Sequence, residues 1–379
     1  MEKPVEQVTR SDSELSKETC EAKLGKRVKG TLVLRVDATI PEIAKIQVAA
    51  SVIQEGGTVA FPTETVYGLG ADALNAKAVK KLFEAKRRPA DNPIIVHVAG
   101  KEYVYQLARD VPKVAERLIA LFWPGPLTLV LKRSKQVPDI TVVGLDTIAI
   151  RMPRNKVALA LLNKSGTPIA APSANLAGKP SPTTAQHVIE DLAGRIDVVL
   201  DAGPTEIGVE STVINMTSDP PEILRPGGTS CEKLMEVLGR VKVHPLVRAE
   251  KRISLAQAVS PGMKHKHYAP EAEMIVVEGT LDKVIKKVQQ LAETHATEGK
   301  KIGILATDES IFNYQADVVR SLGSRQNSSM LAKNLFELLR QFDKEKVDVI
   351  IAEGISLVGL GLAVMNRLRK ASGFNIIRV

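Results

Sequence analysis

The sequence predicts an α/β protein: a first domain with a twisted mixed sheet and covering helices, followed by a smaller parallel α/β domain. Two observations carry this prediction. Short apolar segments alternate with amphipathic helical segments along most of the chain. Aromatic residues make up only 3% of the 379 residues, so the core has to be built from Ala, Val, Ile and Leu. Such a core favours helices packed on a sheet over an aromatic-rich sandwich.

The first region alternates strands with helices from Thr31 to about residue 243. Strands are expected at Thr58–Phe61, Ile94–Val98, Leu127–Leu131, Thr147–Arg151, Ile169–Ala171, Val198–Asp201 and Thr212–Asn215. Helices are expected at Ala76–Lys86, Lys113–Phe122, Val157–Lys164 and Thr183–Leu192. Asn75 is placed to cap the first of these helices, and Pro89 to end it. Proline-containing turns separate many strands, which favours a mixed sheet over a doubly wound one.

The last region repeats the alternation in a simpler form. Strands are expected at Met274–Glu278, Lys301–Ala306, Val347–Ala352 and Asn375–Val379, with helices at Leu281–Glu293, Ser328–Phe342 and Leu362–Ala371. The stretch before them ends in SPGMKHKHYAP and is predicted to be a linker. The predicted division is a polar, mobile tail at 1–30 (or a frayed helix), a first domain at 31–244, the linker at 245–270 and a second domain at 271–379.

The composition is that of a globular protein with anionic partners. Hydrophobic residues are 44%, charged residues are 25%, and no segment is apolar and long enough to predict a membrane span. The first thirty residues lack the apolar stretch of a secretory signal. Cys20 and Cys231 share no motif spacing, which argues against disulfides and favours the cytoplasm. A net charge of +9 favours nucleic acid or phosphorylated small molecules, without choosing between them.

The most informative motif is AFPTETVYGLGADA, residues 60–73. It formally contains the G-x-G-x-x-A pattern. A dinucleotide site would need a helix starting at the glycines, whereas the expected helix starts near Asn75. Gly68 and Gly70 therefore indicate either a tight turn or a substrate loop that uses glycine for close backbone approach. The sequence contains no P-loop pattern.

KRRPADNPIIVH, residues 86–97, places three consecutive cations at the end of a helix. Cations there stabilise the helix dipole, which is one interpretation. Binding of phosphate is the other, because a guanidinium matches phosphate in bidentate fashion and a lysine acts as a point charge. Arg151 ends an otherwise apolar strand and faces either a cleft or the surface.

Later segments place hydroxyls at strand ends. Ser173 of APSAN follows a strand, but no G-x-S-x-G elbow surrounds it, so binding of phosphate or ribose is favoured over a nucleophilic role. GVESTV supplies Ser211, and RPGG supplies Arg225. No histidine belongs to a cluster with zinc spacing, so no metal site on the protein is predicted. Any Mg²⁺ is expected to be held mainly by substrate phosphates.

These motifs occur in a characteristic order. Between residues 62 and 227 the chain contains PTETVYGLGADA, K-x-R, NPIIVH, FWPGPLT, IAIRMP, APSANLAGKPSPT, GVESTV and RPG. This set resembles the YrdC-like family. With SPGM-x-x-x-HYAP and the second domain, the chain is similar to the two-domain members, the threonylcarbamoyl-AMP synthases. The resemblance covers Val33 to the C-terminus, and implies a YrdC-like sheet followed by a Rossmann-like domain.

The resemblance also implies a nucleotidyltransferase reaction. L-threonine, bicarbonate (or CO2) and ATP give threonylcarbamoyl-AMP and pyrophosphate, and a separate transferase complex uses the product to modify tRNA. The tRNA or that complex is therefore a candidate partner. A carbamate oxygen attacks the α-phosphorus, so the protein needs to exclude water, align the reactants and stabilise charge, and needs no nucleophile of its own.

Site residues are carried over motif by motif. The resemblance implies that threonine contacts Thr65, His97, Arg151, Ala171 and Ser211. It implies that ATP contacts Lys86, Arg88, Asn92, Thr147, Ser173, Ser181 and Arg225. Lys86 and Arg88 would neutralise the triphosphate, and Arg151 would pair with the amino acid carboxylate or the carbamate. The linker would close as a lid through His265, His267 and Tyr268, although family members commonly have Tyr at the position of His265.

Two other functions fit parts of the sequence. A non-catalytic tRNA or double-stranded RNA binder would explain the charge but has no need of threonines and hydroxyls at strand ends. A carbamoyltransferase of hydrogenase maturation contains a similar domain but would need additional zinc-binding cysteine pairs. The second domain offers a fold without chemistry: it binds a regulator or partner, or it packs on the first domain and braces the linker.

Overall fold

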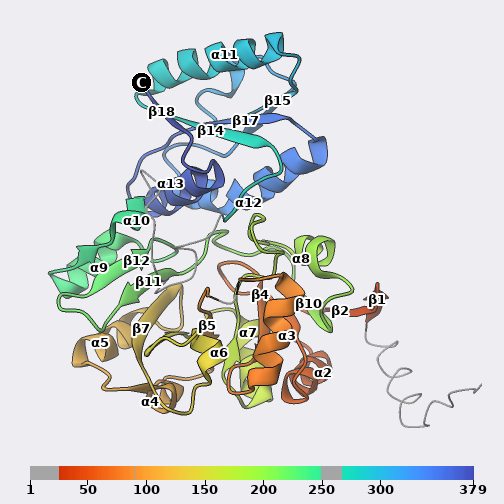
Figure 1. Ribbon diagram of the computed structural model, residues 1–379, viewed down its shortest axis with the longest axis vertical. Helices are drawn as coiled ribbons and strands as arrows, with labels where there is room; N and C mark the ends of the chain where they lie inside the picture. The colour runs from red at the N-terminus through yellow and green to blue at the C-terminus, as the bar shows by residue number, and fades with distance from the viewer. Residues whose placement is uncertain (1–24, 90, 249–266) are drawn as a thin grey trace, which may run out of the picture.

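The computed structural model describes residues 25–89, 91–248 and 267–379, which form two β-sheets with their helices (Figure 1). The first sheet has 13 strands in the order β1-β2-β10-β3-β4-β9-β5-β8-β7-β11-β12-β13, with β6 paired to β7. It contains both parallel pairs, such as β5 with β8, and antiparallel pairs, such as β7 with β8. The predicted mixed sheet is therefore confirmed.

The strands of this sheet are β1 (Lys26–Val28), β2 (Thr31–Arg35), β3 (Val59–Phe61), β4 (Gly68–Asp72), β5 (Ile95–His97), β6 (Ala108–Arg109), β7 (Leu127–Arg133), β8 (Thr147–Arg151), β9 (Ile169–Ala170), β10 (Val198–Asp201), β11 (Thr212–Asn215), β12 (Glu222–Arg225) and β13 (Lys242–Val243). Its helices are α2 (Ile43–Gln54), α3 (Ala76–Lys86), α4 (Glu102–Leu107), α5 (Lys113–Phe122), α6 (Asp139–Val142), α7 (Lys156–Ser165), α8 (Ala185–Leu192), α9 (Cys231–Leu238) and α10 (Pro245–Arg248). As expected, the Asn75 side chain caps α3 by accepting from the amides of Lys77 and Ala78.

The second sheet is smaller and entirely parallel, with the order β16-β15-β17-β14-β18. It contains β14 (Glu273–Glu278), α11 (Leu281–Thr297), β15 (Ile302–Ala306), β16 (Val318–Ser321), α12 (Ser328–Glu345), β17 (Val349–Glu353), α13 (Leu360–Ala371) and β18 (Ile376–Arg378). Figure 1 shows α11 on the outer face of this sheet and α12 and α13 on the face toward the first sheet. The division of the chain at residues 31–244, 245–270 and 271–379 stays a prediction.

The glycines of the GLGADA motif are in a strand. Gly68 to Asp72 form β4, which pairs antiparallel with β3 and β9. A Cβ on Gly70 would lie 2.6 Å from Cγ2 of Ile169 and 2.8 Å from Cε1 of Phe61. The turn and the loop expected here are therefore wrong as secondary structure, although Gly68 lies at the lining of a cavity, where close backbone approach of a substrate stays a prediction. Gly70 is a glycine because the side chains of Ile169 and Phe61 fill the space where its Cβ would lie.

Helix α2 is a second difference, since no helix is predicted between Ile43 and Gln54. Its buried residues, Ile46, Ala49, Ala50 and Ile53, follow the spacing of a helix face. They pack in one cluster with residues of α7. The periodicity that would have predicted α2 is therefore present in the sequence.

One hydrophobic cluster crosses between the two sheets. It joins Leu331, Ala332 and Phe336 of α12 to Val66 and Val209, which lie in loops of the first sheet. Gly208 lies at this contact with φ of +84°, and a Cβ there would lie 2.5 Å from the carbonyl oxygen of Ala332. The second sheet with its helices thus forms a wall behind loops of the first.

Within the described residues, no helix combines the length and apolar character needed to cross a membrane.

Candidate functional site

A cavity opens where several strand ends and loops of the first sheet meet. Strands β5 and β8 are parallel neighbours, so their carboxyl-terminal residues, His97 and Arg151, lie side by side. The β3–β4 loop, the APSAN loop after β9 and the ends of β11 and β12 complete it. The empty space is about 580 Å³, part of it open to solvent. The lining residues are Thr63, Thr65, Val66, Gly68, Arg88, Ile95, His97, Arg151, Ala171, Pro172, Ser173, Glu210, Ser211, Arg225, His267 and Tyr268.

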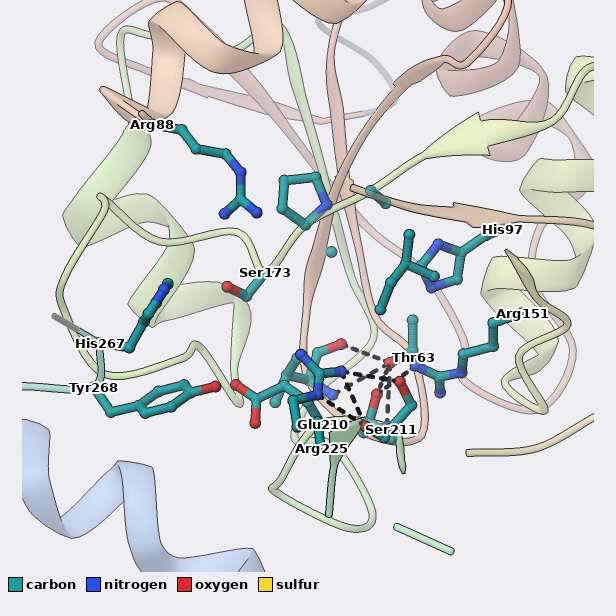
Figure 2. Close-up of a pocket in the computed structure, with 16 residues that line it drawn as sticks. Thr63, Arg88, His97, Arg151, Ser173, Glu210, Ser211, Arg225, His267 and Tyr268 are labelled. Carbon is teal, nitrogen blue, oxygen red and sulfur yellow. Dashed lines mark hydrogen bonds between the residues drawn. The ribbon is translucent and has the colours of Figure 1, made fainter. Parts of the chain in front are cut away.

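Figure 2 shows two sides to this cavity. His97 and Arg151 lie on one side, and we call Thr63, Thr65, His97 and Arg151 the strand-end side. Arg88, Ser173, Tyr268 and His267 lie on the other, with Glu210 and Arg225 between. We call Arg88, Ser173, Glu210, Arg225 and Tyr268 the loop side.

Arg151 organises the strand-end side. Its Nη1 donates to Thr65 Oγ1 at 3.0 Å and its Nε donates to the carbonyl of Gly125 at 3.1 Å. Its Nη2 lies 2.8 Å from Glu64 Oε1, an ion pair in which no N–H is aimed at the oxygen. Arg151 is 3% exposed. A buried, charged guanidinium at the mouth of two strands is suited to a carboxylate ligand.

The two threonines of the motif form a hydrogen-bonded pair. Thr63 Oγ1 and Thr65 Oγ1 are 2.7 Å apart, and Thr63 Oγ1 also donates to the carbonyl of Val66 at 2.6 Å. Since that proton is committed to Val66, the Thr65 hydroxyl is the donor to Thr63. This chain from Arg151 through Thr65 to Thr63 fixes the rotamers that face the cavity.

His97 is buried, and its Nδ1 has no hydrogen-bond partner among the described residues. Burial, followed by the charge of Arg151, lowers the pKa of His97 to about 3. The imidazole is therefore neutral at neutral pH in this structure. Its chemistry is that of a hydrogen-bonding group, suited to a polar substrate atom.

On the loop side, Arg88 and Arg225 are held by main-chain carbonyls. Arg88 Nε donates to the carbonyl of Asn92 at 3.1 Å and Nη2 to that of Pro93 at 2.8 Å. Arg225 Nε and Nη2 donate to the carbonyl of Ser211 at 3.1 and 2.9 Å. Burial lowers the pKa of Arg88 to about 10, so it stays charged at neutral pH. Within the described residues neither arginine forms an ion pair with a carboxylate at contact distance, so both can bind an anion.

Lys86 holds the loop that carries Ser173. Its side chain is 1% exposed, and Nζ donates to the carbonyls of Ser173 and Asn175. Burial, with the charge of Arg88, lowers the pKa of Lys86 well below its usual range. Ser173 Oγ donates to Asn175 Oδ1 at 2.6 Å. Because this proton goes to an amide oxygen and not to a base, the serine is arranged for binding and not for attack.

Ten of the sequence-predicted residues line the cavity: Thr65, Arg88, His97, Arg151, Ala171, Ser173, Ser211, Arg225, His267 and Tyr268. Lys86, Asn92 and Ser181 lie behind this lining, all buried. Ser181 Oγ donates to Glu210 Oε1 at 2.6 Å. Thr147 begins β8 and pairs with Lys132, at the opposite end of the strand from Arg151. His265 lies outside the described residues.

Three acidic or hydroxyl residues of the site were not among the residues assigned a role from the sequence. Thr63 and Glu64 flank the predicted Thr65, and Glu210 precedes Ser211. All three are buried, and Thr63 and Glu210 line the cavity. Glu64 and Glu210 each face a buried arginine, Arg151 and Arg367. The signal for them was a glutamate beside a strand-end hydroxyl, in TET and in VES.

Metal-binding side chains do not gather in the described part of the chain, where no group of three or more His, Cys, Asp or Glu residues is arranged to hold an ion. Glu210 is the carboxylate among the lining residues, and Ser181 and Arg367 already occupy its two oxygens. These donors fit a cation that arrives with its own phosphate ligands and not one held by the protein.

Comparisons with known proteins agree with this geometry. A family model described as "Telomere recombination" (Sua5, YciO and YrdC) matches residues 51–227, and one described as "Threonylcarbamoyl-AMP synthase, C-terminal domain" matches residues 229–373. Threonylcarbamoyl-AMP synthase of Pyrococcus abyssi is 53% identical over 92% of this chain and 100% of its own. That of Bacillus subtilis is 48% identical over 89% of this chain and 95% of its own. That of Xanthomonas campestris is 35% identical over 43% of this chain and 88% of its own.

A solved structure matches the fold over the same length. The crystal structure of P. abyssi Sua5 complexed with L-threonine has a TM-score of 0.88 to this chain, at 53% identity. It covers 92% of this chain and 100% of that one. Both sheets of the present structure therefore have a counterpart in a single solved protein.

Proposed function

Since the chain belongs to the family of two-domain threonylcarbamoyl-AMP synthases, we propose that its cavity joins L-threonine, bicarbonate and ATP into threonylcarbamoyl-AMP and pyrophosphate. The observation that carries the proposal is the charge of the lining. Arg88, Arg151 and Arg225 face one cavity, and its carboxylate, Glu210, is neutralised from outside by Arg367. Such a lining attracts substrates that are all anionic or bear a carboxylate.

L-threonine belongs on the strand-end side. The guanidinium of Arg151 suits its carboxylate, and the neutral imidazole of His97 suits its hydroxyl or amine. The P. abyssi relative binds L-threonine according to its crystal structure, which supports this assignment. Ala171 and Ser211, both in the lining, complete the set of proposed contacts.

ATP belongs on the loop side. Arg88 and Arg225 supply charge for the phosphates, and Ser173 supplies a hydroxyl. We assign Lys86, Asn92 and Ser181 to the support of this side, because each is buried behind the lining. Mg²⁺ would enter on the phosphates and neutralise part of their charge. Thr147 stays a predicted contact of ATP: it begins β8 and is not among the residues that line the cavity.

The residues account for the chemistry without a covalent intermediate. Carbamate formation requires the threonine amine and bicarbonate in contact, and the carbamate oxygen must then reach the α-phosphorus in line with departing pyrophosphate. The arginines stabilise the charge that develops on the phosphate oxygens. His267 and Tyr268 form the wall at the linker and would exclude water from the carbamate.

The wider context of the activity is also part of the proposal. The product would be consumed by a transferase that modifies tRNA, in agreement with the naming of the relatives as synthases of this intermediate. We place the protein in the cytoplasm, because Cys231 is a buried free thiol. The relatives are named as enzymes, which favours catalysis over the non-catalytic RNA-binding alternative.

The test is pyrophosphate release from ATP by the full chain, with and without L-threonine and bicarbonate. We expect release only when both are present, and expect the product to decompose when the reaction is diluted into water. Release that is indifferent to L-threonine would contradict the proposal. L-serine in place of L-threonine is the matched control for the methyl group, because it retains the carboxylate, amine and hydroxyl.

A further inference from the structure

Helix α13 of the second sheet carries an unusual run of buried basic side chains. Arg367, Arg369 and Lys370 are 0%, 4% and 8% exposed. Arginine and lysine are almost never this buried without partners. Each arginine has a glutamate partner, but the two partners belong to different parts of the molecule. This difference identifies what each arginine does.

Arg367 reaches the cavity of the first sheet. Its Nε donates to Glu210 Oε2 at 2.9 Å, and its Nη1 donates to the carbonyl of Pro226 at 2.8 Å and to Asn366 Oδ1 at 3.0 Å. Glu210 lines the cavity, and Pro226 directly follows Arg225. One guanidinium from the second sheet therefore fixes two points of the loop side.

Glu210 transmits this restraint. Its other oxygen accepts from Ser181 Oγ at 2.6 Å, so the carboxylate joins Arg367 to a predicted nucleotide contact. Burial by itself would raise the pKa of Glu210, but the charges of Arg367 and Arg225 outweigh it and lower the pKa to about 2. The carboxylate is therefore charged, and without Arg367 it would be a buried anion beside the place of the phosphates.

Tyr268 is held by the same arginine. The Arg367 guanidinium carbon lies 5.5 Å from the centre of the Tyr268 ring, and the ring stacks on Phe336 of α12 at 5.3 Å. Figure 2 shows the Tyr268 hydroxyl directed toward the Glu210 carboxylate. The wall at the linker and the acidic residue of the cavity thus share one cation from the second sheet.

Arg369 lies two residues away and provides a comparison. Its Nε donates to Glu278 Oε1 at 2.6 Å and its Nη2 to Oε2 at 2.9 Å, and Glu278 ends β14 of the second sheet. Its Nη1 donates to the carbonyl of Arg248. Arg369 is thus a buried arginine of the same helix, with an ion pair of the same type, whose carboxylate partner belongs to the second sheet itself.

We propose that Arg367 is a positioning residue of the active site. By holding Glu210 and the chain at Pro226, it sets Ser181 and Arg225 for the nucleotide, so the loop side is complete only when the second sheet is docked. The assignment of ATP to this side rests on the proposed function. A relative named for the same activity matches only 43% of this chain, so the reaction itself does not require the second domain. Its contribution here is therefore geometric.

The test compares Arg367→Gln with Arg369→Gln in the full chain. Calorimetry measures binding of α,β-methylene-ATP and, separately, of L-threonine. Arg367→Gln should lower the affinity for the analogue by about 30-fold. It should lower the affinity for L-threonine by less than about threefold, because the strand-end side is held by contacts within the first sheet and its loops. Arg369→Gln should change both by less than about threefold. Arg367→Lys keeps a positive charge beside Glu210. It should recover about half of the loss in analogue affinity, measured on a logarithmic scale.

A second measurement needs neither nucleotide nor turnover. Amide hydrogen exchange over residues 208–213 should be faster in Arg367→Gln than in wild type, and unchanged in Arg369→Gln. This result would stand even where wild-type protein failed to release pyrophosphate, so the two proposals fail separately. Equal effects of the two substitutions on analogue binding and on exchange would overturn the positioning role, because they would indicate general loss of docking. Unchanged analogue binding in Arg367→Gln would overturn it as well.

Discussion

The two sides of the cavity differ in where their supports come from. On the strand-end side, Arg151 is held by Thr65, by the carbonyl of Gly125 and by Glu64, all in the first sheet or its loops. On the loop side, Glu210 is held by Arg367 of α13, and Tyr268 rests on Phe336 of α12. One side is therefore complete within the first domain, whereas the other depends on a second one. Substitutions that disturb the second domain should therefore lower mainly the affinity for the nucleotide.

The largest expected effect is on the loop side itself. Arg88→Ala removes a cation whose other N–H groups are fixed on the carbonyls of Asn92 and Pro93, so it is preorganised for phosphate. We expect kcat/KM for ATP to fall by about 10³-fold, with L-threonine affinity changed by less than about threefold. Pyrophosphate release and calorimetry measure the two quantities.

Arg87→Ala is the matched control for this substitution. Arg87 is the exposed neighbour, in the left-handed conformation that ends α3. It should retain nearly all activity. Near-normal activity of Arg88→Ala would instead indicate that Arg88 only stabilises the dipole at the end of α3.

Gly208 is the position at which the strand-end side also contacts the second domain. A substitution there should therefore affect L-threonine binding through the second domain. The amide of Gly208 donates to the carbonyl of Thr65 at 3.1 Å, and its Cα faces Ala332 of α12. Gly208→Ala adds positive-φ strain and a clash with backbone, so we expect a loss of about 3 kcal/mol in the free energy of unfolding. L-threonine affinity should fall as well. Urea unfolding and calorimetry measure these changes.

Gly203→Ala is the control that separates the strain of a positive φ from the steric clash expected in Gly208→Ala. Gly203 also has positive φ, +79°, but a Cβ there meets nothing within 4 Å. It should lose only about 1 kcal/mol of the free energy of unfolding and keep its L-threonine affinity. Equal losses in the two variants would mean that α12 does not press on this loop.

Thr65→Val tests the independence of the strand-end side. The substitution leaves the buried Arg151 Nη1 without the acceptor Thr65 Oγ1 and removes the proton that Thr65 gives to Thr63. L-threonine affinity should therefore fall by about 30-fold, equivalent to about 2 kcal/mol. Affinity for α,β-methylene-ATP should change by less than about threefold. Calorimetric titrations with each ligand measure both.

Thr141→Val is the control for loss of a buried hydroxyl elsewhere, since Thr141 Oγ1 donates to the carbonyl of Ala73. It should reduce stability without changing either affinity. A comparable loss of nucleotide affinity in Thr65→Val would show that the two sides are not separable.

The smallest effect concerns pH and the strand-end side. The pKa of His97 is lowered to about 3 in the folded protein, below its ordinary 6.5. Between these values the unfolded chain binds a proton that the folded one does not, so stability falls as the pH decreases through this window. From pH 6.5 to 5.5, wild type should lose about 1 kcal/mol more in the free energy of unfolding than His97→Asn. Urea unfolding at both pH values gives the difference. Parallel losses in the two proteins would mean that His97 is hydrated.

Much of the architecture was predictable because it rests on local patterns. The bounds of α3, α5, β8, β10 and β11 agree with the predicted ranges. In α3 the apolar face, the Asn75 cap and the nearby proline all indicate the same helix. Residues that follow a strand end were also predicted well, since parallel neighbours bring their ends together, as with His97 and Arg151.

The amino-acid sequence was enough to predict the two α/β regions, the cations and hydroxyls of the site, and the family to which they point. The folded structure was needed to show that Gly68 and Gly70 lie in a strand, that Lys86 supports a loop, and that Arg367 neutralises Glu210. The physical reason is sequence distance. Helix periodicity and capping act within a few residues and leave a local signal. A buried ion pair between residues 157 positions apart, or a side chain that fills the space above a glycine, exists only after distant segments have packed together.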